Sequence, residues 1–137
     1  MKSAKKGILL INLGTPDGPE PPQVDAYLRQ FLMDPYVIDI PWPFRWFLVN
    51  VLVVPKRAYA SSAAYKKIWT SRGSPLLFHT ADLAEKLQKE VSHPVRFGMR
   101  YGKPSIQAAV DDLVNQGVTE IVAFPLYPQY SLSATET

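Results

Sequence analysis

The chain has 137 residues, 47% of them hydrophobic and 20% charged, which is enough to bury the core of one domain. It contains no cysteine, so disulfides, thiolate metal sites and thiol nucleophiles are excluded. The formal net charge of +3 comes without a block of lysine and arginine, so the composition does not indicate nucleic-acid binding.

The first predicted element is a buried strand over residues 7–13, which form an apolar run. Basic residues precede this run, as they do in a signal peptide. The run is short, however, and Gly14, Thr15 and Pro16 follow it in place of a small-residue cleavage site. We therefore expect a strand that is covered on both faces, as in a parallel sheet.

A helix is predicted next, because Pro21 and Pro22 suit a first helical turn. Apolar residues then recur at helical spacing, at Val24, Tyr27, Leu28, Phe31 and Leu32.

Residues 40–54 are almost entirely apolar and include Trp42 and Trp46. This stretch is shorter than the roughly 20 residues that a membrane-spanning helix needs. Two interpretations stay open, a buried core helix and an exposed apolar lip that touches a membrane or covers a hydrophobic ligand. The nearby cations Arg45, Lys56 and Arg57 suit the headgroup boundary of a membrane.

The rest of the chain alternates helices and strands. Helices are expected from 57 towards 69, after Thr80 as a candidate N-cap, and between Pro104 and Gly117; strands are expected over 95–100 and 120–124. The helix after Thr80 has the apolar stripe Leu83, Ala84, Leu87 and Val91. This alternation predicts an α/β fold, an open parallel sheet flanked by helices in three layers, as one domain over 1–137.

Ligands of open α/β sheets bind beyond the carboxyl ends of the strands. The residues at those ends offer an arginine, phenols, amides and hydroxyls: Asn12, Leu13, Thr15, Arg100, Tyr101, Tyr127, Gln129, Tyr130 and Ser131. No phosphate-binding glycine motif and no nucleophile elbow is present. His79 and His93 lack metal-ligand spacing and are interpreted as surface or capping residues. The rim suits a flat apolar ligand with acidic groups.

Five short motifs occur in a fixed order: Leu-Ile-Asn-Leu-Gly-Thr-Pro at 10–16, Tyr-Lys-Lys-Ile-Trp-Thr at 65–70, Gly-Ser-Pro-Leu at 73–76, Met-Arg-Tyr-Gly at 99–102 and Pro-Leu-Tyr-Pro-Gln-Tyr-Ser at 125–131. Together with the apolar stretch at 40–54, this order resembles the ferrochelatases, which insert ferrous iron into a porphyrin in haem synthesis. The resemblance covers essentially the whole chain.

The resemblance implies two similar α/β halves around a porphyrin cleft, with a metal-contacting histidine and a later acidic residue in the second half. We therefore expect this chain to be the N-terminal half of a two-domain chelatase, with the C-terminal half of the same protein as its partner. It is expected to hold no catalytic residue, metal or cofactor, to bind no nucleic acid, and to be inactive alone. Ferrous iron and porphyrin are then substrates of the full-length protein.

The resemblance also assigns porphyrin-binding positions, namely Leu13, Arg57, Tyr65, Ser74, Arg100, Tyr101, Tyr130 and Ser131. In the family, Leu13 faces the macrocycle, Arg57 pairs with a propionate, and Arg100 belongs to the inner pocket near the metal side. The residues themselves leave other interpretations open: Leu13 as core, Arg100 as a strand cap or the partner of an aspartate, and Tyr130 as loop packing. The apolar lip at the cleft mouth is assigned to Trp42, Phe44, Trp46, Phe47 and Leu48.

The function implied is that of a lyase-type ferrochelatase acting on protoporphyrin IX or coproporphyrin III. The alternative is a non-catalytic tetrapyrrole-binding or membrane-docking module on the same fold. A generic flavodoxin-like ligand domain is disfavoured because no phosphate loop is present. Without a transit-like leader, the expected location is the bacterial cytoplasm, with a peripheral contact at the inner membrane.

Overall fold

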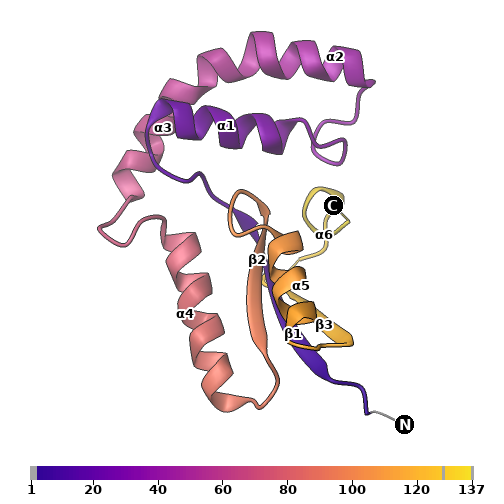
Figure 1. The fold of residues 1–137 in the computed structure, drawn as a ribbon. Coiled ribbons are helices and arrows are strands. Elements are labelled where there is room, and N and C mark those ends of the chain that lie inside the picture. Colours follow the sequence, from indigo (N-terminus) through magenta and orange to yellow (C-terminus); the bar gives the residue numbers. More distant parts are fainter. Residues whose placement is uncertain (1–2, 128, 137) are drawn as a thin grey trace. The chain divides into compact units, whose positions relative to one another are not determined.

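The computed structural model describes residues 3–127 and 129–136 (Figure 1). These residues divide into two compact units, and each is described by itself. The sheet unit contains residues 3–14 and 76–127, and the helical unit contains residues 15–75 and 129–136. The expectation of one domain over 1–137 stays a prediction.

The sheet unit is built on three parallel strands in the order β2-β1-β3. They are β1 (Lys6–Gly14), β2 (Val95–Tyr101) and β3 (Glu120–Pro125). Each predicted strand is therefore present, and its observed ends differ from the predicted ones by at most one residue. Because β1 lies in the middle, it is hydrogen-bonded to a strand on each side. Helices on the two faces of such a parallel sheet can then cover its apolar side chains.

Two helices cover opposite faces of this sheet, α4 (Pro75–Glu90) and α5 (Ile106–Asn115) (Figure 1). Leu9 packs with Leu113 of α5, whereas the next residue, Leu10, packs with Ala84 of α4. Successive side chains of a strand point to opposite faces, so this alternation produces two cores on one strand. The predicted α/β fold, an open parallel sheet flanked by helices, is confirmed.

Two details of the α4 prediction are wrong. Thr80 does not cap the helix but lies inside it, because α4 already begins at Pro75, and its hydroxyl donates to the carbonyl of Leu76 (2.7 Å). Leu83, predicted for the apolar stripe, is exposed, while Ala84 is buried.

The α5 prediction differs at its first residue. Its N-cap is Ser105, whose hydroxyl accepts from the Ala108 N–H (3.1 Å), so Pro104 lies one residue before the cap. Gly117 follows the helix with φ +80°, as expected for its C-terminal end.

The helical unit consists of α1 (Pro21–Leu32), α2 (Trp42–Phe47), η1 (Leu48–Val53), α3 (Val54–Ile68) and the short α6 (Leu132–Thr135). The α2, η1 and α3 segments follow one another as a continuous helical stretch, and α1 runs alongside it (Figure 1). The buried residues of α1, Val24 and Tyr27, belong to its predicted apolar stripe. No helix in the described part of the chain is long and apolar enough to span a membrane.

The middle of this helical stretch, η1, is a π-helix, which the sequence analysis did not predict. Asn50 supplies hydrogen bonds there: its side-chain amide donates to the Trp46 carbonyl (3.0 Å), and its Oδ1 accepts from Arg29 of α1 (2.6 Å). In a π-helix the backbone hydrogen bonds join residues i and i+5 and not i and i+4, so some carbonyls at the junction with an α-helix lack their usual donor. A side-chain amide that donates to such a carbonyl stabilises the junction.

Candidate functional site

In the sheet unit, the carboxyl ends of β1 and β2 bring three predicted site residues together. Asn12 pairs with Met99 and Gly14 with Tyr101, so Leu13 lies level with Arg100. The strands approach closely here, because a Cβ on Gly14 would lie 1.8 Å from the Tyr101 carbonyl oxygen. Gly14 also has φ +125°, a conformation that other residues rarely adopt. The Leu-Gly-Thr and Arg-Tyr-Gly motifs thus meet at one edge of the sheet.

Arg100 lies against an aromatic ring at this end of the sheet. Its guanidinium carbon is 4.8 Å from the centre of the Tyr101 ring, within cation–π range, and Tyr101 is only 1% exposed. Burial raises the pKa of Tyr127, and the positive charge of Arg100 partly offsets that rise. One cation and two phenols therefore share this end of the sheet.

Tyr127 is the residue that the site assignment omitted. The sequence signal was available, since Tyr127 belongs to the same 125–131 motif as Tyr130 and Ser131. It lies two residues after the end of β3, within the electrostatic reach of Arg100.

In the helical unit, α3 carries two of the predicted residues, Arg57 and Tyr65. Arg57 is exposed. Tyr65 is half-buried, its ring meets that of Trp69 edge-on at 6.4 Å, and burial raises the pKa of its phenol. The two positions are eight residues apart, so they lie on neighbouring sides of the helix.

Ser74 lies in the turn before α4 and is only 3% exposed. Its hydroxyl accepts a hydrogen bond from the Thr15 hydroxyl (2.8 Å), and Thr15 is equally buried. In this structure the pair ties the Gly-Thr-Pro loop to the Gly-Ser-Pro turn. A direct contact between Ser74 and a substrate carboxylate stays a prediction.

Tyr130 and Ser131 lie in the segment that leads into α6. Tyr130 is exposed, and its hydroxyl donates to Glu136 Oε1 (2.6 Å), a hydrogen bond that raises the pKa of Tyr130. Ser131 is the N-cap residue of α6, and its backbone N–H donates to the Thr135 hydroxyl (3.2 Å). Both residues belong to the helical unit, whereas Leu13 and Arg100 belong to the sheet unit.

The apolar lip, residues 40–54, is largely exposed. Trp42 and Phe44 are 60% and 69% exposed. Four further apolar side chains of the lip are also exposed, namely Trp46, Phe47, Val51 and Leu52. Leu48 is half-buried, and only Val49 and Val54 of the apolar residues are buried. This exposure argues against a buried core helix, and contact of the lip with a membrane or a ligand stays a prediction.

Arg45 corrects one part of the lip prediction. It is not at the surface with Lys56 and Arg57, because it is only 8% exposed. Its Nη1 donates to the carbonyls of Ile38 (3.3 Å) and Ile40 (3.0 Å), so it fastens the preceding loop to α2. An arginine with a long aliphatic stem can be buried when backbone carbonyls receive its N–H groups.

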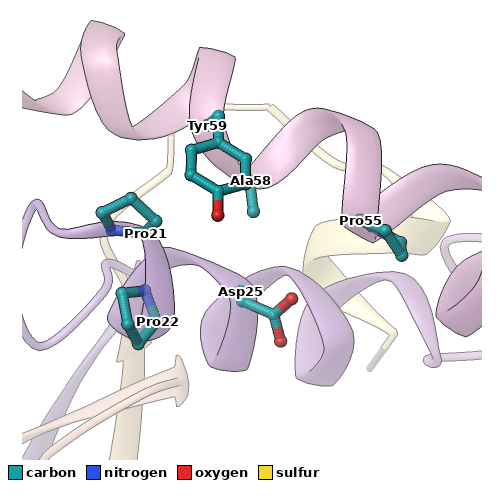
Figure 2. Close-up of a pocket in the computed structure, with 6 residues that line it drawn as sticks. All are labelled: Pro21, Pro22, Asp25, Pro55, Ala58 and Tyr59. Carbon is teal, nitrogen blue, oxygen red and sulfur yellow. The ribbon is translucent and has the colours of Figure 1, made fainter.

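A groove of about 570 Å³ lies between α1 and α3 in the helical unit (Figure 2). It is lined by Pro21, Pro22, Asp25, Pro55, Ala58 and Tyr59. Arg57 is two residues from both Pro55 and Tyr59, about 200° around the helix, and so faces away from the groove. None of the predicted porphyrin-binding residues lines it.

Among the described residues, no group of three histidine, cysteine, aspartate or glutamate side chains is arranged to hold a metal ion. His79 and His93 are both exposed, in agreement with their interpretation as surface residues.

Comparison with known proteins gives one consistent family. The ferrochelatase family model matches residues 5–137. Similar proteins, all named ferrochelatase, come from Actinobacillus pleuropneumoniae serotype 5b strain L20 (46% identical; 98% of this chain, 44% of that protein), Coxiella burnetii strain Dugway 5J108-111 (47%; 96% and 38%) and Ectopseudomonas mendocina strain ymp (49%; 95% and 38%). The chain thus spans less than half the length of these curated relatives. With the five motifs, the match over nearly every residue shows that the chain belongs to the ferrochelatase family.

Proposed function

We propose that the protein carrying this chain is a lyase-type ferrochelatase that inserts ferrous iron into protoporphyrin IX or coproporphyrin III in haem biosynthesis. The family match over residues 5–137 carries this proposal. In the reaction, ferrous iron bonds to the four pyrrole nitrogens and two pyrrole protons leave. Iron and porphyrin are both substrates, and no resident cofactor is proposed for this chain.

The sheet unit supplies part of the grip on the macrocycle. Leu13 offers an apolar contact to its face, and Arg100 offers a cation beside the phenols of Tyr101 and Tyr127. A planar porphyrin resists metalation because its nitrogens are crowded and partly protonated. Binding energy used to bend the ring therefore speeds metal entry, and such bending needs side chains on rigid elements.

The helical unit supplies groups for the acidic substituents. Arg57 is exposed on α3 and can form a charge-assisted hydrogen bond with a propionate. Tyr65 and the Thr15–Ser74 pair offer hydroxyls. The groups that contact the metal and accept the pyrrole protons are proposed to come from the rest of the protein, so the isolated chain should bind without catalysing metalation.

Metal insertion by the full-length protein tests the proposal. Zinc or ferrous iron is added with protoporphyrin IX, and the loss of free-porphyrin absorption is followed. Arg100→Ala should lower kcat/KM by about tenfold or more, the scale of a lost charged hydrogen bond. The matched control is Arg96→Ala, because Arg96 lies on the same strand but pairs with Asp112 of α5. An equal loss in both variants would remove the proposed role of Arg100.

The alternative function is a non-catalytic tetrapyrrole-binding or membrane-docking module. It predicts a shift of the porphyrin absorption band on binding, with no metal insertion at any metal concentration. That outcome in the full-length protein would replace the enzyme proposal.

We further propose a cytoplasmic protein with a peripheral membrane contact through the apolar lip. Tryptophan and phenylalanine side chains are exposed on the same helical stretch as Lys56 and Arg57, a combination suited to an interface with anionic lipid. The affinity of the protein for phosphatidylglycerol vesicles is measured by co-sedimentation. It should fall about tenfold when Trp42 and Phe44 are both changed to serine. The control changes Leu83 and Val114, which are exposed but lie in the sheet unit. If the unmodified protein, the lip variant and the control variant bind the vesicles equally, the lip is excluded as the membrane contact.

A further inference from the structure

A chain of three hydrogen bonds links the backbone of α4 to the backbone of Leu13 within the sheet unit. The Thr80 hydroxyl donates to the Leu76 carbonyl (2.7 Å) and accepts from the side-chain amide of Asn12 (3.1 Å). The Asn12 Oδ1 in turn accepts the backbone N–H of Leu13 (2.8 Å). Thr80 is only 3% exposed, so water does not replace these bonds readily.

The end of β3 explains why Leu13 needs this partner. The carbonyl of Ile11 accepts from Leu126 just beyond β3, so the N–H of Leu13, two residues later, points to the same side. The register of β3 ends with Pro125 opposite Ile11, and the described residues that follow, 126 and 127, are not in a strand that could accept this N–H. Asn12 fills the place of the missing ladder partner.

The polarity of the chain is fixed by its ends. The Leu76 carbonyl can only accept, so Thr80 uses its single hydroxyl proton there and must accept from Asn12. The amide nitrogen of Asn12 therefore points to Thr80, and its oxygen points to the Leu13 N–H. No other orientation of the Asn12 amide satisfies all three bonds.

We propose that Asn12 and Thr80 are positioning residues that hold Leu13 against the porphyrin ring, an inference that rests on the proposed function. Neither side chain is assigned a contact with the substrate. Asn12 lies on the α4 face of β1, with Leu10, whereas the neighbouring Leu13 points to the opposite face. They act through the backbone by fixing the residue that provides the apolar contact.

A double-mutant cycle in the full-length protein tests this proposal. Thr80→Val keeps the side-chain shape and removes the hydroxyl, and Thr80→Ser keeps the hydroxyl. The dissociation constant for protoporphyrin IX is measured by quenching of tryptophan fluorescence, in the native and in the Leu13→Ala background. In the native background, Thr80→Val should weaken binding about fivefold, the scale of one net hydrogen bond, and Thr80→Ser should restore it. In the Leu13→Ala background, Thr80→Val should change binding less than about twofold.

A purely structural role of Thr80 would weaken binding equally in both backgrounds, and that result overturns the proposal. If Thr80→Val does not fold, Asn12→Ala replaces it, since it removes both Asn12 bonds and leaves the Thr80–Leu76 bond in place; the same dependence on Leu13 is expected. Metal insertion by the unmodified protein is measured first. Its absence would refute the proposed function, whereas insertion with an additive cycle refutes only the positioning role.

Discussion

Two apolar segments of the chain have opposite environments. In β1, Leu9 and Leu10 are each 3% exposed and belong to separate cores on the two faces of the sheet. In the apolar lip, residues of equal or greater hydrophobicity, such as Trp42 and Phe44, are mostly exposed. Hydrophobic composition therefore does not decide burial in this molecule.

The difference follows from what surrounds each segment. The central strand β1 has a neighbour on each side and helices α4 and α5 on its two faces, so every position except Lys6 is buried or half-buried. The lip is helical and packs through a narrow stripe that includes Val49 and Val54, which leaves the rest of its circumference uncovered. Exposed apolar surfaces of this kind are typical of interaction sites, and the role of the lip as one stays a proposal.

The largest expected effect on stability comes from a substitution at Gly14, the last residue of the buried strand β1. Gly14→Ala places a Cβ 1.8 Å from the Tyr101 carbonyl oxygen at φ +125°, so the strand ends must move apart. We expect a loss of about 4 kcal/mol in the free energy of unfolding, measured by urea denaturation.

Gly73 in the helical unit provides the matched control. It also has a positive φ (+93°), but an added Cβ has no neighbour within 4 Å. Gly73→Ala should therefore cost only the conformational strain, about 1 kcal/mol. Similar losses for the two variants would show that the close approach of β1 and β2 contributes little.

A second test compares one leucine from each segment. Leu9→Ala leaves a cavity beside Leu113 and should lower the free energy of unfolding by about 3 kcal/mol. Leu52→Ala, at an exposed position of the lip, should change it by less than about 0.5 kcal/mol. Urea denaturation measures both, and a large loss in Leu52→Ala would mean that the lip is covered in solution.

The smallest expected effect concerns Tyr65 on α3, the helix that continues the lip. Burial raises its pKa above the ordinary value of 10.0, so the unfolded chain loses this phenolic proton at a lower pH than the folded chain. The stabilisation is complete below pH 10.0 and is lost as the pH rises from there through the folded-state pKa. Tyr65→Phe should make this alkaline loss of stability shallower in urea midpoints recorded from pH 8 to 11, and an unchanged slope would contradict it.

Local patterns predicted most of the regular structure. The apolar run at 7–13, the proline pair before Val24 and the alternation after Pro94 each indicated the observed element, because a strand or an amphipathic helix leaves a local periodic signature. The motifs likewise placed Leu13, Arg100 and Tyr101 at strand ends. The porphyrin-binding roles of these residues remain predictions.

Features that depend on individual side-chain hydrogen bonds were missed. Threonine is a common helix-capping residue, but the Thr80 hydroxyl accepts from Asn12, which is 68 residues away in the chain. Arg45 is of a residue type usual at surfaces, but it is buried and its Nη1 donates to two carbonyls of the preceding loop. In the π-helix, Asn50 bonds to the Trp46 carbonyl and to Arg29 of α1. None of these hydrogen bonds leaves a periodic pattern in the sequence.

The sequence by itself determined the alternation of strands and helices, the order of the family motifs and the apolar character of the lip, because these depend on residues close together in the chain. Tertiary structure alone decided the strand order β2-β1-β3, the burial of Arg45 and the bond chain from α4 to Leu13. The physical reason is that hydrogen-bond partners and covered faces are set by which segments meet in space, and burial then makes each unpaired polar group costly.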